Sequence, residues 1–380
     1  MGSALIWLAI FTGFCLVLQW AGIGLALRAL WRRPAGALDG GLVPLPPVTV
    51  LRPVCGSENF LEETLETTFQ ADYPSFELIF CAADPADPAV TLVRRLMAKY
   101  PQVTAQVLTG DDKVSGNPKL NNLVKGWNAA RHDYVLMSDS NVILPPDYLK
   151  RCMAEFTPDT GLVSSPPIGI RPQTFWARVE CAFLNTFQAR WQMASSALGI
   201  GFAQGKMLFW DARVLKAAGG IAILGREMAE DVAATKTVRA AGKVVRLPGR
   251  FFEQPVGRRD RATVWSRQVR WAKVRRLGFP LYFLPEILAG AALPFLAILG
   301  LVAMGISPFV ILLFLALWYG PEYALAVAGN WPRSPADLAA WVTRDALLPA
   351  LWLAAWRGNS FEWRGNAMTA EDIARAKAPR

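Results

Sequence analysis

The chain has very little histidine, and its cysteines lack the spacing of a metal or redox site. With one histidine, His132, the sequence excludes a metal site built from several imidazoles, and we interpret His132 as an ordinary surface or turn residue. Its five cysteines include no Cys-x-x-Cys pair, so neither a disulfide framework nor a zinc site is indicated. These absences favour a domain that faces a reducing compartment, the cytoplasm.

Charge is missing from the amino-terminal segment. No charged side chain occurs from Met1 to Leu27, and Arg28, Arg32 and Arg33 follow. This order predicts one transmembrane helix with its amino terminus outside and its exit on the cytoplasmic side. A cleaved signal peptide is the alternative, but its positive charges would precede the apolar run.

A second uncharged stretch lies in the carboxyl-terminal third. No formal charge occurs from Ile287 to Pro321, and Gly305 with Ser307-Pro308 interrupts the stretch near its middle. We therefore expect two more helices of membrane length, the second carrying Glu322 toward its far end.

A further apolar segment, Ala336 to Trp356, contains Arg344 and Asp345. We expect it to span the membrane, to lie in the interface or to re-enter, which gives two to three carboxyl-terminal membrane helices. Two spans after the first helix return the basic tail, Arg357 and Arg364, to the cytoplasm.

The composition is too apolar for an ordinary soluble protein. Of the 380 residues, 53% are hydrophobic and 18% are charged, and the mean hydropathy is +0.25. The net charge of +10 suits nucleic acid, anionic lipid or a phosphorylated substrate. Because membrane segments are present, we expect the bilayer and a phosphorylated substrate as partners, and no nucleic acid.

Three parts are predicted along the chain: a transmembrane anchor over residues 1–33, a cytoplasmic catalytic domain over 47–280, and a membrane region with a cytoplasmic tail over 281–380. A loop rich in glycine and proline, Gly36 to Pro47, follows the anchor. The catalytic domain ends in a basic amphipathic helix.

Short strands alternate with helices of about ten residues in the first half of the catalytic domain. The predicted strands are Val48–Leu51, Phe76–Ala83, Val103–Leu108 and Tyr134–Ser138, and the predicted helices are Asn59–Phe69, Ala89–Tyr100 and Lys119–Ala130. This alternation predicts an α/β fold with a mainly parallel sheet covered on both faces. Such sheets bind ligands at the carboxyl ends of their strands.

Polar side chains follow two of these strands. Asp84 follows the second strand, where a carboxylate would point into the nucleotide crevice, although such aspartates also form ordinary turns. Asp139 and Asn141 follow the fourth strand and both offer oxygen to a hard cation that also holds a diphosphate. The alternative for Asp139 is a cap of the next turn.

A pair of carboxylates, Glu230-Asp231, begins a predicted helix that ends before Gly242. Acidic residues in a first turn are stabilised by the helix dipole, which is the structural interpretation. The catalytic interpretation is general-base work, because a hydroxyl that attacks a sugar must lose its proton as the new bond forms.

Three cationic residues, Arg267, Arg270 and Lys273, recur every three positions in a helix after Thr263, next to Trp271. The planar fork of arginine suits a pyrophosphate because it donates two hydrogen bonds together. The same helix also suits anionic lipid, and the two roles are compatible.

The order of these residues resembles a known family. Asp84, Asp139, Glu230-Asp231 and Arg267-Gln-Val-Arg270-Trp271 follow the D, D, D, (Q/R)xxRW signature of processive and lipid-directed family 2-like glycosyltransferases. Three segments narrow the resemblance to ceramide glucosyltransferases, especially bacterial ones: Asn117-Pro-Lys119-Leu-Asn-Asn122, Gly205-Lys206 and Trp363-Arg364-Gly365. The resemblance covers nearly the whole chain.

This resemblance implies a GT-A catalytic fold, a UDP-sugar donor, a divalent cation (Mg²⁺ or Mn²⁺) and inversion at the anomeric carbon. In that family the residue matching Asp84 contacts the nucleotide, and the residue matching Asp139 serves the metal and the diphosphate. The residue matching Asp231 acts as the base, with Glu230 beside it. Asn141 is the expected second metal ligand.

The resemblance also implies roles for three residues of the basic helix and for Lys119. Those matching Arg267, Arg270 and Trp271 help to bind the donor diphosphate and to shape the acceptor site, and Lys119 matches a lysine near the donor. Two departures stand out: Asn141 replaces the second aspartate of many relatives, and no histidine occurs from Gln188 to Met193, where animal ceramide glucosyltransferases carry one.

The expected function is inverting transfer of glucose from UDP-glucose to the primary hydroxyl of ceramide, at the cytoplasmic face of the cell inner membrane. One alternative keeps the fold and transfers N-acetylglucosamine, galactose or glucuronic acid to a hopanoid or diacylglycerol. Another is a catalytically inactive membrane scaffold. A processive polysaccharide synthase is less favoured, because few spanning helices follow the catalytic domain.

Overall fold

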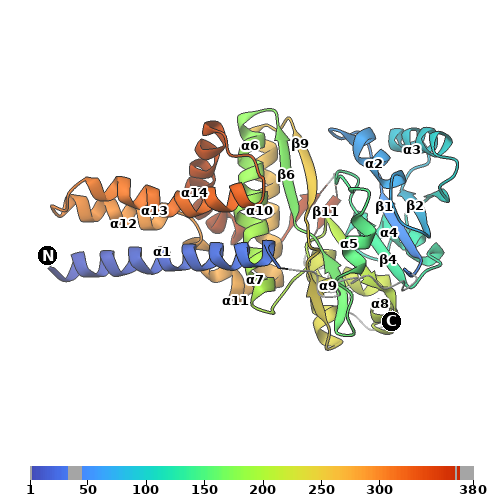
Figure 1. Cartoon of the computed structure of the whole chain (residues 1–380), viewed down its shortest axis with the longest axis horizontal. Helices are drawn as coiled ribbons and strands as arrows, with labels where there is room; N and C mark the ends of the chain where they lie inside the picture. The colour runs from blue at the N-terminus through green and yellow to red at the C-terminus, as the bar shows by residue number, and fades with distance from the viewer. Residues whose placement is uncertain (1, 33–44, 364–365, 369–380) are drawn as a thin grey trace. The chain divides into compact units, whose positions relative to one another are not determined.

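The computed structural model describes residues 2–32, 45–363 and 366–368, and its helices and strands are labelled in Figure 1. The chain divides into two units. The helical unit comprises Met1–Trp31, Gly169–Leu198 and Val256–Gly358, and the sheet unit comprises Arg32–Ile168, Gly199–Pro255 and Asn359–Arg380. Most of the predicted loop Gly36 to Pro47, together with Arg33, Arg364 and Gly365, lies outside the described residues.

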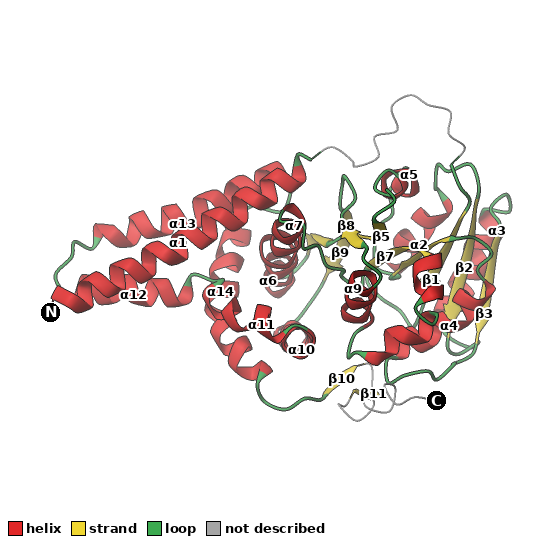
Figure 2. Ribbon diagram, turned by 90° about the horizontal axis from the view of Figure 1, so that it is seen from below, coloured by secondary structure: helices red, strands yellow, loops and turns green. Residues whose placement is uncertain are grey.

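The sheet unit is built on a seven-stranded sheet with the order β3-β2-β1-β4-β7-β5-β8 (Figure 2). Its strands are β1 (Val48–Pro53), β2 (Phe76–Ala82), β3 (Ala105–Thr109), β4 (Tyr134–Ser138), β5 (Thr160–Ser164), β7 (Met207–Asp211) and β8 (Val244–Arg246). β7 runs antiparallel to both of its neighbours, and the other pairs are parallel. The mainly parallel α/β sheet predicted from the sequence is confirmed.

Helices cover the two faces of this sheet. They are α2 (Leu61–Phe69), α3 (Pro88–Lys99), α4 (Pro118–Ala129), α5 (Tyr148–Met153), α8 (Ala212–Ala217), a 3₁₀ turn (Ile221–Arg226) and α9 (Glu230–Ala240). Alternate side chains of each strand enter opposite cores: Val48 and Val50 of β1 pack with α2 and α3, whereas Leu51 packs with α4. Burial on both faces explains the continuous apolar runs of these strands.

The first half of the sheet unit follows the sequence prediction closely. Tyr134–Ser138 is the fourth strand as predicted, and the other predicted strands and helices end within two residues of their observed bounds. Two smaller pairs of strands complete the strand inventory of the described residues: β6 (Pro167–Pro172) with β9 (Phe252–Gly257), and β10 (Phe361–Trp363) with β11 (Asn366–Met368).

The helical unit contains four helices long and apolar enough to cross a membrane: Gly2–Leu30, Pro280–Ala303, Phe309–Ala328 and Pro335–Ala355. Its elements are α1 (Gly2–Leu30), α6 (Phe175–Ala182), a π-helix (Phe183–Ala189), α7 (Arg190–Ala197), α10 (Arg261–Gly278), α11 (Pro280–Phe283), a 3₁₀ turn (Leu284–Leu288), α12 (Ala292–Ala303), α13 (Phe309–Ala328) and α14 (Pro335–Ala355). α1 lies beside α12 and α13 (Figure 2). The predicted break between α12 and α13 falls at Gly305, whose φ is +98°.

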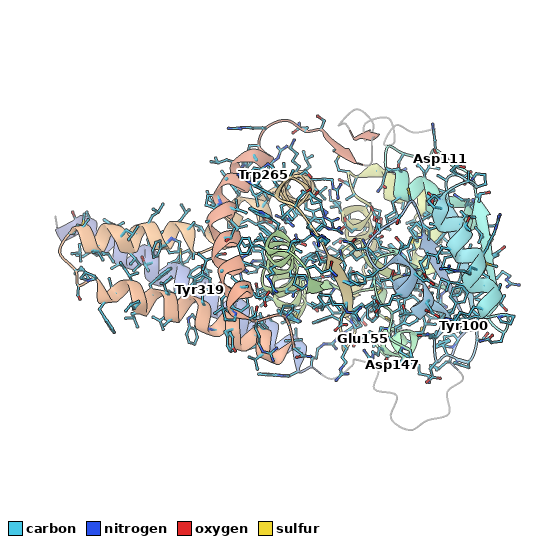
Figure 3. All side chains as sticks on the ribbon, turned by 90° about the horizontal axis from the view of Figure 1, so that it is seen from above. Tyr100, Asp111, Asp147, Glu155, Trp265 and Tyr319 are labelled. Atoms are coloured by element: carbon cyan, nitrogen blue, oxygen red, sulfur yellow. The ribbon has the colours of Figure 1, made fainter. Side chains whose placement is uncertain are left out.

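Buried charges inside the helical unit neutralise one another. Arg344 of α14 lies 2.7 Å from Glu322 of α13 and 2.8 Å from the neighbouring Asp345. The second oxygen of Asp345 accepts hydrogen bonds from Trp318 Nε1 (3.2 Å) and the Tyr319 hydroxyl (3.0 Å), and Tyr319 is labelled in Figure 3. Because these charges are paired, they do not prevent α14 from lying at membrane depth.

Candidate active site

The candidate site lies where β4 ends and β7 begins. Because β7 is antiparallel to β4, its first residue Met207 pairs with Ser138, the last residue of β4. The backbone N–H of Asp139 donates to the carbonyl of Lys206 at 3.0 Å, which extends the ladder beyond both strands. The polar loop after β4 and the Gly205-Lys206 segment are therefore fixed side by side.

Lys119 joins three of the polar segments. Its Nζ lies 2.6 Å from Asp139 Oδ1 and 2.7 Å from Glu230 Oε1, and it donates to the carbonyl of Gly205 at 2.5 Å. Burial opposes its charge, but the Asp139 and Glu230 carboxylates hold the pKa of Lys119 above its usual range. Lys119 is therefore an ammonium group that neutralises two acids from distant parts of the sequence.

The helix that carries Lys119 is positioned by its own cap. Asn117 precedes α4, and its side-chain oxygen accepts hydrogen bonds from the backbone of Lys119 and Leu120, while Pro118 occupies the first turn. The Asn117 amide nitrogen also donates to Glu230 Oε2 at 2.8 Å. The Asn-Pro-Lys segment thus begins with a helix cap, Asn117, that binds the same carboxylate as its lysine.

A second lysine holds the oxygens expected to bind a metal. Lys206 Nζ lies 2.8 Å from Asp139 Oδ2 and donates to Asn141 Oδ1 at 3.0 Å. Burial raises the pKa of Asp139, but Lys119 and Lys206 outweigh burial and hold that pKa well below the usual range of an aspartate. Asp139 is therefore anionic at neutral pH.

A buried arginine shapes the loop that carries Asp139 and Asn141. Arg52, at the end of β1, is fully buried, and its Nη2 donates to the carbonyls of Thr64 (3.0 Å), Ser140 (3.3 Å) and Val142 (3.2 Å). Burial lowers the pKa of Arg52 to about 10. The loop backbone after β4 is thus held by the guanidinium group.

Asp231 lies beside Glu230 at the start of α9, in the first turn that the sequence predicted. Its two oxygens accept hydrogen bonds from the backbone N–H groups of Gly205 (2.9 Å) and Val232 (2.8 Å). Burial and the neighbouring Glu230 carboxylate raise the pKa of Asp231 to about 7, although Lys119 and the two N–H groups partly oppose them. A carboxylate with this pKa is suited to accept a proton near neutral pH.

Position 205 favours glycine because the Glu230 and Asp231 carboxylates lie close to its backbone. A Cβ placed on Gly205 would lie 2.8 Å from Glu230 Oε1 and 3.5 Å from Asp231 Oδ2. A Cβ there would press on Glu230 Oε1, so glycine lets the backbone of position 205 donate to Asp231 without moving the Glu230 carboxylate.

The other predicted donor residues lie outside this cluster. Asp84 follows β2 at the same edge of the parallel sheet, is exposed, and accepts a hydrogen bond from Ala86 N at 2.8 Å within its own turn. Among the described residues it makes no hydrogen bond or ion pair with the cluster. Its turn contact agrees with the structural alternative, and its role toward a nucleotide stays a prediction.

Arg267, Arg270 and Trp271 lie on α10 in the helical unit. The Arg267 guanidinium lies 3.1 Å from the carboxylate of Glu180 and 5.0 Å from the centroid of the Trp271 ring. Trp271 packs against an apolar cluster that includes Ala177. α10 thus forms as expected, and the roles of the three residues toward a donor stay predictions.

Asp139 and Asn141 offer the oxygen ligands that Mg²⁺ and Mn²⁺ prefer. Their two oxygens converge on one nitrogen, Lys206 Nζ, so the pair is arranged to hold a single cation. Among the described residues no group of three His, Cys, Asp or Glu side chains forms a complete metal site. The pair therefore fits a cation whose remaining ligands come from substrate phosphates and water.

Sequence reasoning assigned no site role to Asn117, Gly205, Lys206 or Arg52. The Asn-Pro-Lys and Gly-Lys segments were noticeable only as parts of a family pattern, and their contacts depend on the pairing of β4 with β7. Arg52 lies in a strand and carried no local signal of its role.

A solved structure identifies the fold of this chain. A mannosyltransferase from Pyrobaculum calidifontis, solved in complex with GDP-Man and Mn²⁺, superimposes with a TM-score of 0.58 at 20% identity, covering 94% of this chain and 98% of that one. This similarity shows a GT-A-like fold, as the sequence resemblance implied. The protein thus has a GT-A-like domain together with long apolar helices.

The chain belongs to glycosyl transferase family 21, whose family model matches residues 11–376. It is 27% identical over 333 residues to ceramide glucosyltransferase 3 of Caenorhabditis elegans, covering 85% of this chain and 72% of the relative. It is 42% identical over 108 residues to a ceramide glucosyltransferase of Komagataella phaffii, covering 26% of this chain and 21% of the relative. The family resemblance inferred from the motifs is confirmed.

Proposed function

We propose that this protein transfers glucose from UDP-glucose to the primary hydroxyl of ceramide, which yields β-glucosylceramide and UDP. One observation carries the proposal: Asp231, with a pKa of about 7, lies next to the half-buried Lys119, which bridges Asp139 and Glu230. A base at neutral pH and a cationic group lie together, as transfer from a nucleotide diphosphate requires.

Asp231 accepts the proton of the ceramide hydroxyl while the oxygen of that hydroxyl attacks the anomeric carbon of glucose. The new carbon–oxygen bond forms as the bond to the diphosphate breaks on the opposite face, which inverts the configuration. The leaving UDP carries the electron pair of the broken bond as negative charge. The Glu230 carboxylate, paired with Lys119 and Asn117, helps to raise the pKa of Asp231.

On the donor side, Asp84 contacts the nucleotide, and Asp139 with Asn141 hold the divalent cation, which compensates diphosphate charge when bound. Lys119, Arg267 and Arg270 supply further positive charge for the leaving diphosphate. The family model and the fold support this assignment, because both extend over the segments that carry these residues.

The acceptor is a membrane lipid, because exposing each CH₂ of a two-chain lipid to water costs about 0.8 kcal/mol. Phe279, Tyr282 and Phe283 follow the basic helix α10 and are candidates to contact this lipid. Phe283 is 1% exposed and packs inside the helical unit, so it belongs to a core instead. Tyr282 (59% exposed) and Leu281 (80% exposed) are the residues available to contact lipid.

The catalytic site faces the cytoplasm at the inner membrane. Arg28 near the end of α1 and Arg32 just after it support this orientation, because positive residues flank spanning helices on the cytoplasmic side. Two of the three carboxyl-terminal candidate spans then return the chain to the same side.

The direct test incubates purified full-length protein with UDP-glucose, ceramide and Mn²⁺ and identifies the lipid product by mass spectrometry. β-Glucosylceramide and stoichiometric UDP are expected. A parallel panel pairs UDP-galactose, UDP-glucuronic acid and UDP-N-acetylglucosamine with ceramide, diacylglycerol and a hopanoid. Absence of a ceramide product with every UDP-hexose would remove ceramide as the acceptor.

A second candidate keeps the chemistry and changes the lipid. The segment from Gln188 to Met193 contains no histidine, unlike animal ceramide glucosyltransferases, so the acceptor side of this chain differs from theirs. Transfer of N-acetylglucosamine, galactose or glucuronic acid to a hopanoid or diacylglycerol is the corresponding function. Lipid profiles of cells with and without the gene distinguish the two.

A further inference from the structure

Lys206 holds the two oxygens that a divalent cation would use. Its ammonium lies 2.8 Å from Asp139 Oδ2 and 3.0 Å from Asn141 Oδ1, and its side chain is 16% exposed. The residue is also fixed through its backbone, because its carbonyl accepts the Asp139 N–H at 3.0 Å. The ammonium is therefore held at these oxygens from a rigid strand start.

The local charge around Asp139 disfavours a free divalent cation. The pair Asp139 and Asn141 carries one negative charge, because position 141 is an amide, and that charge already faces the ammonium groups of Lys119 and Lys206. A cation that enters alone must displace one ammonium group and remain close to the other. A cation that enters with a diphosphate meets additional negative charge, which both the cation and the displaced lysine can pair with.

We propose that Lys206 competes with the divalent cation for Asp139 and Asn141, so that this chain binds the cation tightly only together with the donor diphosphate. The inference rests on the proposed function, which places the cation at these two residues. Lys206 is thus a specificity-determining residue: it occupies the oxygens of Asp139 and Asn141 until a nucleotide diphosphate arrives. By thermodynamic linkage, the cation and the nucleotide strengthen each other's binding by the same factor.

The experiment measures Mn²⁺ binding to full-length protein in detergent by the electron paramagnetic resonance signal of free Mn²⁺, with and without UDP. Wild-type protein should bind Mn²⁺ weakly alone and much more tightly with UDP. Lys206→Met should bind Mn²⁺ without UDP about tenfold more tightly, since one positive charge next to the ligands is gone. The factor by which UDP tightens Mn²⁺ binding should become correspondingly smaller in this variant.

Two variants control for charge and position. Lys206→Arg retains the positive charge and should retain the weak binding of Mn²⁺ without UDP. Lys216→Met removes an ammonium whose side chain is 55% exposed and whose partner Asp133 lies at 3.7 Å, and it should match wild type. Lys206→Gln removes the charge but keeps a polar head, and it replaces Lys206→Met if the methionine variant melts at a lower temperature than wild type.

Unchanged or weaker Mn²⁺ binding in both neutral variants, in protein that still melts cooperatively, would overturn the competition. Equally tight Mn²⁺ binding by Lys206→Arg and Lys206→Met would also overturn the competition. Absence of Mn²⁺ binding in every protein, even with UDP, would remove the cation site itself. Since no sugar or lipid acceptor is present in these titrations, an error in the proposed acceptor leaves their result unaffected.

Discussion

Replacing Asp231 with asparagine removes the proposed base while almost preserving the shape of the side chain. The Asp231 carboxylate accepts backbone N–H groups from Gly205 and Val232, one on each oxygen. An asparagine has one acceptor oxygen, so one of these hydrogen bonds is lost and the free energy of unfolding should fall by about 1 kcal/mol. That loss is partly offset, because the repulsion between Asp231 and Glu230 disappears with the charge.

The effect on catalysis should be far larger than the effect on folding. A positioned general base contributes about 10²-fold to 10⁴-fold, so kcat for glucosylceramide formation should fall by about that factor in Asp231→Asn. The dissociation constant of UDP should change by less than about threefold, because the base acts in the transition state rather than in binding the nucleotide.

The assay combines radiolabelled transfer for kcat with calorimetric titration of UDP in the presence of Mn²⁺. Asp133→Asn is the matched control, since Asp133 lies just before β4, at the opposite end of the strand from Asp139, and its side chain is 58% exposed. The control should retain wild-type turnover. Normal turnover in Asp231→Asn would refute the assignment of the base, and a parallel loss of UDP affinity would reassign Asp231 to donor binding.

Four further predictions concern the same cluster and the loop beside it. The rate of transfer should rise with pH through a midpoint near 7, because Asp231 must lose its proton to act, and a pH–rate profile that stays flat from 5.5 to 8.5 would contradict this assignment. The pKa of Asp231 is raised from 3.8 to about 7 in the folded state, so between these pH values the folded protein binds more protons than the unfolded chain. The free energy of unfolding should therefore fall as the pH rises from about 4 to 7, which denaturant unfolding at several pH values can measure. Lys119→Met should reduce folding stability by about 3 kcal/mol, because Glu230 loses its ammonium partner and keeps only the Asn117 amide, while Asp139 keeps Lys206. Thermal unfolding that matches wild type would show that the bridge is dispensable. Arg52→Met should cost about 3 kcal/mol in unfolding experiments, because the carbonyls of Thr64, Ser140 and Val142 lose the guanidinium that donates to them. It should also weaken UDP and Mn²⁺ binding through movement of the Asp139 loop.

The first half of the sheet unit was predictable because its strands are buried on both faces and its helices carry clear caps. Asp87 and Asn117 each cap a helix that begins with proline, so α3 and α4 have strong local starting signals. The strands after β4 had no such signal. β8 has three residues, and β7 runs antiparallel to β4, an arrangement that depends on pairing between residues far apart in the sequence.

Those parts of the site could be predicted whose residue types and spacing in the sequence indicate a metal ligand or a base. Asp139, Asn141, Glu230 and Asp231 were singled out, and the structure brings the segments that carry them together around Lys119. The contact between Asp139 and Lys206 was not predictable, because it follows from the register of β4 against β7 rather than from either segment. The same limit applies to Arg52, whose carbonyl partners lie in α2 and in the loop after β4.

The helical unit is assembled from three stretches of chain that the ribosome produces at different times. α1 packs against α7, and α6 packs against α14, so the middle stretch contacts both the first and the last. A polypeptide cut off before α12 would therefore expose the surfaces of α1 that pack against α12 and α13, and the surface of α6 that packs against α14. Attempts to obtain a soluble enzyme by trimming the carboxyl-terminal helices should give aggregates, whereas the complete chain extracted in detergent should stay monodisperse.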